Sequence, residues 1–157
     1  GAFGRELGDV VEYADILIDG KVERIMAKDL DFGYRYSKVK SLGTVVGVNL
    51  RLAEGSRTRI AKDMKGYAIA RSKSQPKGRS LGSVFKKPGV TSAGYYIDMA
   101  GLKGYRIGGA QISDMHANFI INAGEATSTD FIRLADYAKQ EVDKRYGIKL
   151  EYEVDFL

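Results

Sequence analysis

The fold is decided by residues 10–26, which read VVEYADILI, then DG, then KVERIM. Two runs rich in β-branched and aromatic residues flank Asp19-Gly20, and Asp-Gly between such runs is the strongest short-range signal for a two-residue β-hairpin. We therefore predict strands over 10–18 and 21–26. A third strand is predicted over 41–52, where apolar residues partly alternate. The front of the chain is expected to form an antiparallel sheet.

Helices are predicted in the middle and near the end of the chain. After Ser56, a reasonable N-cap, apolar residues recur every three or four positions and predict an amphipathic helix over 57–72. The best helical pattern lies at 127–146, where one face is apolar, Thr127 or Ser128 can cap the start, and Gly147 can end the helix.

Shorter elements complete the pattern. A helix is predicted over 95–100, a buried strand over 119–122 and a last strand over 149–156. Strands and helices together predict the α+β class.

Residues 72–77 show no periodicity and contain Gln75-Pro76, which is typical of a connector. We therefore predict a front domain over 1–74 and a small α+β domain over 75–157.

Composition excludes several classes of chemistry. The chain has 157 residues, 44% of them hydrophobic, and it contains no cysteine and one histidine, His116. Disulfides, thiolate nucleophiles and cysteine or histidine-rich metal centres are therefore not expected. There is no apolar run of about 18 residues and no signal-peptide pattern. We expect a cytoplasmic protein without a membrane partner or a bound metal.

Basic residues are concentrated between Arg51 and Lys87, and the net charge is +5. This charge predicts an anionic partner, either nucleic acid or a nucleotide-linked or carboxylated small molecule. A solvated basic face without a ligand is the alternative. Aromatic residues do not interleave with the cations as a stacking platform requires, and no nucleic-acid recognition motif is present. Nucleic acid is therefore the weaker interpretation.

The segment Gly82-Ser83-Val84-Phe85-Lys86-Lys87-Pro88 places a hydroxyl beside two positive charges, just before a predicted turn. Such a segment can hold an anion and deliver a proton. The glycines at 101, 104, 108 and 109 do not have the spacing of a dinucleotide-binding loop. Glu151 and Glu153 would share one face of a strand, which a solvated strand would also explain.

Several of these segments, in this order, resemble the UDP-N-acetylenolpyruvoylglucosamine reductase (MurB) family. The resemblance runs from end to end of the chain, and it is closest to the branch without a substrate-covering insertion. The segments that carry it are 1–4 (GAFG), 32–37 (FGYRYS), 82–88 (GSVFKKP), 93–110, 116–122 (HANFIIN) and 151–154 (EYEV).

The resemblance implies a flavoenzyme of bacterial cell-wall synthesis. In that family NADPH reduces FAD, and the flavin passes hydride to the enolpyruvyl group of UDP-N-acetylglucosamine enolpyruvate, which yields UDP-N-acetylmuramate. Ser83 would protonate the carbanion-like intermediate. Arg35 and Glu153 would polarise the substrate carboxylate and stabilise the enolate form. Glu153 would need to be protonated or paired with Arg35.

The resemblance also implies contacts with ligands. Substrate would meet Tyr34, Lys73, Lys87 and His116, and the flavin would meet Gly1, Ala2, Arg35 and Ser83. Each residue has a simpler alternative: a loop serine, a surface arginine, an exposed strand glutamate or a structural histidine.

The family's FAD-binding front domain would precede Gly1. We therefore expect the chain to be a fragment that binds FAD poorly and is inactive alone, with FAD held mainly by the missing domain. The parent is expected to be a monomer. The alternative is a UDP-sugar-binding fragment without catalysis.

Overall fold

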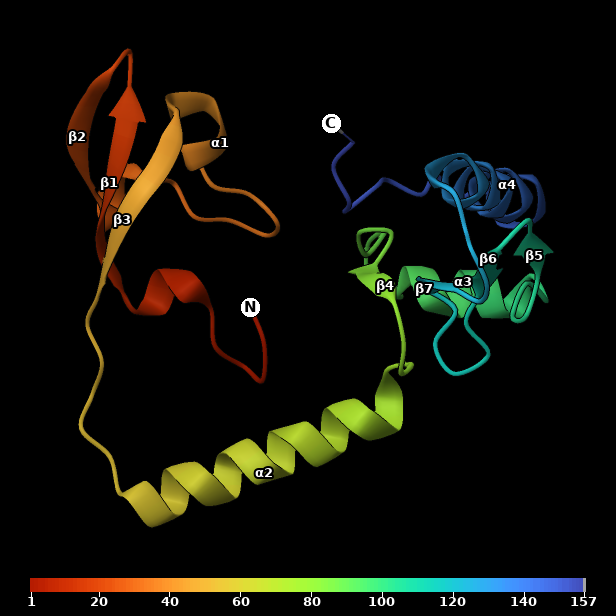
Figure 1. Cartoon of the computed structure of the whole chain (residues 1–157), viewed down its shortest axis with the longest axis horizontal. Helices are drawn as coiled ribbons and strands as arrows, with labels where there is room; N and C mark the ends of the chain where they lie inside the picture. The colour runs from red at the N-terminus through yellow and green to blue at the C-terminus, as the bar shows by residue number, and fades with distance from the viewer. Residues whose placement is uncertain (157) are drawn as a thin grey trace. The chain divides into compact units, whose positions relative to one another are not determined.

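The computed structural model describes residues 1–156, and the chain forms two compact units, residues 1–67 and a second unit that begins at Ala68 (Figure 1). The division falls inside α2 (Arg57–Ser74), so this helix runs from one unit into the other. The predicted domain boundary between residues 74 and 75 coincides with the end of α2. Antiparallel strands and helices occur together in the chain, which confirms the α+β class.

Unit 1 is built on the predicted hairpin. Strand β1 (Val11–Ile18) pairs antiparallel with β2 (Lys21–Met26) and with β3 (Thr44–Leu50), in the order β2-β1-β3. The turn residues Asp19 and Gly20 have φ values of 47° and 78°. Positive φ at both positions defines the type I′ turn that Asp-Gly favours, so the hairpin prediction is confirmed.

The predicted strand over 41–52 is shorter in the structure. Residues Val39–Leu42 form the helical turn α1, and ladder pairing with β1 begins only at Thr44. Two 3₁₀ turns, η1 (Leu7–Asp9) and η2 (Ala27–Asp29), flank the hairpin. The buried core of unit 1 is small and consists of Val11, Ala14, Ile16 and Leu30.

Helix α2 confirms the predicted helix and extends to Ser74, but its apolar residues are not buried within residues 1–156. Ile60 is 48% exposed and Met64 is 66% exposed. Tyr67 stacks on Phe3, with ring centroids 4.0 Å apart, and so ties the start of the chain to the helix. The helix follows the local propensity of its alanine, lysine and arginine residues rather than the burial of an apolar face.

Unit 2 contains a four-stranded antiparallel sheet, ordered β4-β7-β6-β5 (Figure 1). Its strands are β4 (Ser80–Ser83), β5 (Arg106–Ile107), β6 (Ala110–Ile112) and β7 (Phe119–Asn122). Of these four, the sequence predicts only β7. Its central position, between β4 and β6, agrees with its apolar composition.

Two helices complete the core of unit 2. Helix α3 (Ala93–Met99) begins two residues before the predicted start, and its N-cap is Ser92, whose side chain accepts a hydrogen bond from Tyr95 N. Helix α4 (Ser128–Tyr146) has Thr127 as N-cap and Gly147 as a left-handed C-cap, as predicted. The shared core contains Val84, Phe85, Ala93, Ile97, Ala100, Leu102, Ala110, Ile112, Ala117, Ile120, Leu134, Ala135, Ala138, Val142 and Leu150.

The predicted last strand over 149–156 is wrong. The closing segment makes one isolated antiparallel pairing, between Phe85 and Tyr152, and is otherwise irregular. Its partner is the irregular segment that follows β4, so no regular ladder can form there. Among the helices within residues 1–156, none has the length and apolar character needed to cross a membrane.

Candidate functional site

Ser83 is the last residue of β4 and lies half-buried beside Phe119 of β7, its register partner. The two residues that follow it, Val84 and Phe85, are buried in the core. Their burial fixes the backbone just after the serine. Within residues 1–156 the Ser83 hydroxyl has no hydrogen-bond partner. The hydroxyl is therefore available to a bound molecule.

Backbone hydrogen bonds hold the segment after Ser83 from two sides. On one side, Val84 N donates to Asn118 O at 2.8 Å. On the other side, Glu153 N donates to Val84 O at 2.8 Å, and Lys86 N donates to Glu151 O at 2.9 Å. The structure thus brings together three segments that lie far apart in the sequence: the serine segment, the segment 116–122 and the closing segment.

Glu153 and two lysines surround this part of unit 2. Glu153 is half-buried on the closing segment, next to the backbone that follows Ser83. Lys86 pairs with Glu151, with Nζ 3.4 Å from Oε2, so its charge is partly balanced. Lys87 is exposed. Ser83, Glu153 and the cationic side chains of Lys86 and Lys87 therefore occupy adjoining segments.

His116 lies half-buried in the loop before β7, with its ring edge against Phe119 at a centroid distance of 4.8 Å. Its Nδ1 accepts a hydrogen bond from Asn118 N at 3.2 Å. A neutral His116 ring must therefore carry its proton on Nε2. Burial, together with the positive charge of Lys103, lowers the pKa of His116. At neutral pH the ring is an uncharged hydrogen-bond donor.

This pKa shift predicts a pH dependence of stability. In the unfolded chain the histidine takes up its proton near pH 6.5, whereas the folded chain binds that proton only at lower pH. The stability that His116 contributes should be complete above about pH 6.5 and should fall as the pH drops through the folded pKa. Denaturant unfolding at several pH values should show this loss in the wild type and not in His116→Gln. The same slope in both proteins would contradict it.

Tyr152 anchors the closing segment to α4. Its hydroxyl donates to Asp136 Oδ1 at 2.7 Å, and its ring stacks on Phe85 with centroids 5.3 Å apart. Lys139 Nζ lies 4.3 Å from the ring centroid. Burial and the hydrogen bond to Asp136 raise the pKa of Tyr152, so the phenol stays protonated. The sequence alone assigns no role to Tyr152, because its partners lie on a separate helix and on the segment that follows β4.

Arg35 and Tyr34 occupy the tip of a tight turn in unit 1. Gly33 N donates to Tyr36 O at 3.0 Å, and Tyr36 N donates to Gly33 O at 3.1 Å. Arg35 has a φ of 54°, in the left-handed region, which costs a residue with a side chain roughly 1–2 kcal/mol. Strain of this kind is concentrated at functional sites, because the surrounding structure must maintain it. The guanidinium carbon lies 5.1 Å from the centroid of the Tyr34 ring.

A cavity of about 500 Å³ in unit 1 includes Arg35 in its lining. The other lining residues are mainly apolar, among them Leu30, Phe32 and Val48. A mainly apolar cavity with an arginine in its lining can hold a flat aromatic ring that carries hydrogen-bond acceptors.

The remaining sequence-predicted residues are exposed. Ala2 forms a turn in which its N–H donates to Arg5 O at 2.8 Å, and Gly1 precedes that turn in unit 1. Lys73 lies in the last turn of α2. Across residues 1–156, no group of three histidine or carboxylate side chains could hold a metal ion.

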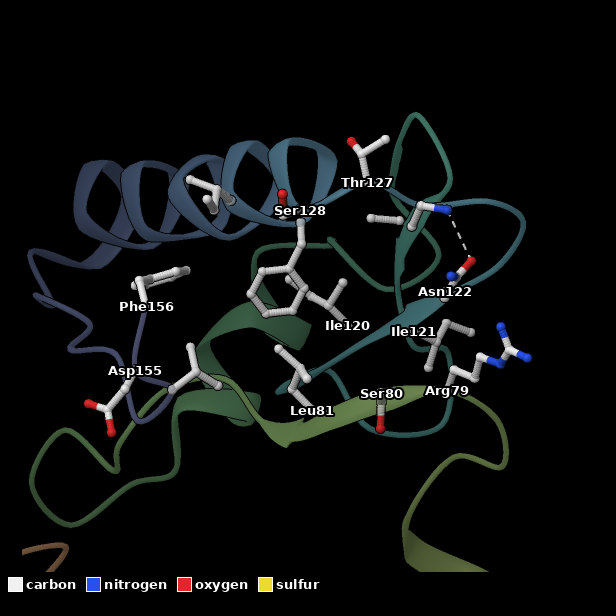
Figure 2. Close-up of a pocket in the computed structure, with 15 residues that line it drawn as sticks. Arg79, Ser80, Leu81, Ile120, Ile121, Asn122, Thr127, Ser128, Asp155 and Phe156 are labelled. Atoms are coloured by element: carbon white, nitrogen blue, oxygen red, sulfur yellow. Dashed lines mark hydrogen bonds between the residues drawn. The ribbon is translucent and has the colours of Figure 1, made fainter. Parts of the chain in front are cut away.

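A second cavity of about 500 Å³ lies in unit 2, between the sheet, the start of α4 and the closing segment (Figure 2). Leu81, Ile120 and Phe156 contribute apolar walls, and Arg79 lies at one end. We call this second cavity the apolar groove. None of the predicted site residues lines it. The serine segment and the groove are therefore separate features of the same unit.

Known proteins resemble this chain, including the segments described above. Residues 74–157 match the family described as UDP-N-acetylenolpyruvoylglucosamine reductase, C-terminal domain. UDP-N-acetylenolpyruvoylglucosamine reductases of Streptococcus pneumoniae strains Hungary19A-6 and TIGR4 are each 41% identical over 160 residues, which cover 100% of this chain and 53% and 51% of the relatives. The chain thus spans about half the length of these relatives.

A solved structure also resembles this chain. The crystal structure of UDP-N-acetylenolpyruvylglucosamine reductase from Thermus caldophilus superposes with a TM-score of 0.84 and 37% sequence identity. The match covers 97% of this chain and 55% of that one.

Proposed function

Because this chain belongs to the UDP-N-acetylenolpyruvoylglucosamine reductase family, we propose that it supplies the substrate-side residues of such an enzyme. The reaction is the FAD-dependent, NADPH-driven reduction of UDP-N-acetylglucosamine enolpyruvate to UDP-N-acetylmuramate. This step belongs to peptidoglycan synthesis in the bacterial cytoplasm.

One observation supports the proposal most strongly. In unit 2 the Ser83 segment lies between the backbone of Asn118 and the backbone of Glu151–Glu153, and the hydroxyl has no partner within residues 1–156. A proton donor and a carboxyl group thus occupy adjoining segments, with Lys86 and Lys87 next along the chain. The reduction of a carboxylated double bond needs a proton donor and positive charge or hydrogen-bond donors near the developing enolate.

The proposed chemistry assigns one task to each residue. A reduced flavin, when bound, would supply hydride to one carbon of the enolpyruvyl double bond. The electron pair of that bond would then move toward the substrate carboxylate, where Arg35, together with a Glu153 that is protonated or paired with it, stabilises the enolate form. A guanidinium suits this task because it meets a carboxylate through two hydrogen bonds and stays charged. The Ser83 hydroxyl gives its proton to the other carbon, and solvent restores the serine proton.

We propose that Lys73 and Lys87 attract the diphosphate, that Tyr34 contacts the substrate, and that His116 donates from Nε2. FAD is held mainly by sequence outside residues 1–157, with contributions from Gly1, Ala2, Arg35 and Ser83. The apolar cavity that Arg35 lines supports the flavin contact.

A second candidate is binding of a UDP-sugar without catalysis. It is favoured by unit 2, which has its own core and contains Ser83, Lys87, His116 and Glu153. The 157-residue chain, titrated with UDP-N-acetylglucosamine enolpyruvate in the absence of flavin, tests this function directly.

The proposed function is tested with the natural protein that contains this chain, loaded with FAD. NADPH oxidation should depend on UDP-N-acetylglucosamine enolpyruvate, and mass spectrometry should identify UDP-N-acetylmuramate in an amount equal to the NADPH consumed. NADPH oxidation that is independent of the sugar nucleotide, with no reduced product, would refute the reductase assignment.

A further inference from the structure

We infer that Asn118 is a positioning residue for Ser83 and His116. This inference rests on the proposed function, because those two residues are its proposed proton donor and substrate donor. In the proposed mechanism Asn118 contacts neither the substrate nor the flavin. It acts through the backbone after Ser83 and through the ring of His116.

The side chain of Asn118 replaces a strand partner where the ladder ends. Regular pairing of β4 with β7 stops at Ser83 and Phe119. Just beyond, Phe85 N donates to Asn118 Oδ1 at 3.0 Å, and Asn118 Nδ2 donates to Phe85 O at 2.8 Å. One amide group thus satisfies both backbone groups of Phe85, as a neighbouring strand would.

The backbone of Asn118 makes two further contacts with the proposed site. Its carbonyl accepts from Val84 N at 2.8 Å, so that Val84 and Phe85 are both fixed by one residue. Its N–H donates to His116 Nδ1 at 3.2 Å and leaves Nε2 as the proton-bearing nitrogen. A single residue therefore sets the position of the serine segment and the tautomer of the histidine.

The hydrogen bonds of the Asn118 side chain are buried. Asn118 is 7% exposed, and within residues 1–156 every fully buried side-chain nitrogen and oxygen has a partner. A buried side-chain amide that bonds both the N–H and the C=O of another residue is costly to replace. Loss of either hydrogen bond leaves a buried polar group without a partner. Removing the Asn118 amide should release the backbone of Phe85 and allow Ser83, two residues earlier, to move. A displacement of about 1 Å at a reacting group can cost 10²-fold in rate.

The test separates the two half-reactions of the FAD-loaded natural protein by anaerobic stopped flow. In Asn118→Ala, flavin reduction by NADPH should stay within about two-fold of wild type, and flavin reoxidation by UDP-N-acetylglucosamine enolpyruvate should slow about 10²-fold. Reoxidation at the wild-type rate would overturn the inference. Equal slowing of both half-reactions would also overturn it, because a general structural defect has that signature.

Asn118→Asp provides a variant of the same shape that should fold. Its ionised carboxylate accepts from Phe85 N but cannot donate to Phe85 O, whereas the protonated acid can do both. Reoxidation should therefore recover as the pH falls. Four segments surround Asn118: helix α3 with the residues after it, the loop before β7, the serine segment and the closing segment. Their titratable and charged groups are Tyr95, Tyr96, Asp98, Lys103, Asp114, His116, Lys86, Lys87, Glu151, Tyr152, Glu153 and Asp155. They are unchanged in Asn118→Ala, whose pH profile is the reference.

The pH profiles of the two variants decide whether Asn118 positions the serine segment. Recovery at low pH in Asn118→Asp, absent from Asn118→Ala, supports the positioning role. Parallel pH profiles in the two variants would contradict it. If the wild-type flavin is not reoxidised by the substrate at all, the proposed function fails, and the positioning role fails with it for that separate reason.

Discussion

Ser83→Ala in the FAD-loaded natural protein should leave flavin reduction by NADPH intact and slow flavin reoxidation by the enolpyruvyl substrate by about 10²–10⁴-fold. The structure explains why so large an effect is expected from one oxygen atom. The hydroxyl lies at the end of β4 with no partner within residues 1–156, so its removal breaks no internal hydrogen bond. Loss of rate would therefore report lost proton donation and not lost folding.

Ser80→Ala is the matched control for this change. Ser80 begins the same strand, is exposed, and accepts a weak hydrogen bond from Gly82 N at 3.4 Å. The control variant should reoxidise its flavin at nearly the wild-type rate. A Ser83→Ala protein that reoxidises within about three-fold of wild type would remove Ser83 from the mechanism.

Gly109→Ala should lower the stability by about 3 kcal/mol, since overpacking of a close contact costs this much when nothing can move aside. A Cβ at this position would lie 2.1 Å from Gly124 O and 2.4 Å from Ala126 N. Both atoms belong to the backbone, so no side-chain rotation relieves the clash. The midpoint of thermal unfolding should fall by on the order of 10 °C.

Gly66→Ala is a control variant that should raise the stability instead of lowering it. A Cβ at Gly66 would meet nothing within 4 Å, and the residue lies inside the exposed helix α2. Alanine there should stabilise the helix by about 0.5–1 kcal/mol. Chemical denaturation of the 157-residue chain measures both variants. Equal stability of Gly109→Ala and wild type would show that the segment around Ala126 can move away from residue 109.

The elements that the sequence predicts correctly are those with local signals. The 10–26 hairpin has its Asp-Gly turn, and α4 has Thr127 and Gly147 at its two ends. These residues act on the backbone within a few positions of themselves, so a sequence window contains the whole cause. Helix α2 is also predicted, from a three- and four-residue apolar periodicity, although the residues that form this pattern are not buried within residues 1–156.

The elements that the sequence does not predict depend on distant partners. Strands β5 and β6 have two and three residues, too few to show a period, although Gly108-Gly109 joins them as a two-residue loop. The closing segment has the pattern of a strand, but it meets only the irregular backbone after Ser83. Pairings between segments about 70 residues apart leave no mark in a local pattern.

The candidate site likewise contains some residues that the sequence predicts and others that it does not. Ser83 and Glu153 are predicted through the resemblance of their segments, and the structure places those segments side by side in unit 2. Asn118 and Tyr152 receive no role from the sequence, although one holds Phe85 and the other joins the closing segment to Asp136. Such supporting residues are defined by contacts across the fold, and their types alone do not reveal them.

A crystal structure of the FAD-loaded natural protein with UDP-N-acetylglucosamine enolpyruvate bound would show whether Ser83 is the proton donor. We expect an enolpyruvyl carbon about 3–3.5 Å from Ser83 Oγ, which is the separation of reacting atoms poised for transfer. The substrate carboxylate should lie on the side of Glu153. A substrate bound instead in the apolar groove beside α4, with Ser83 Oγ in contact only with water, would contradict the proposed mechanism.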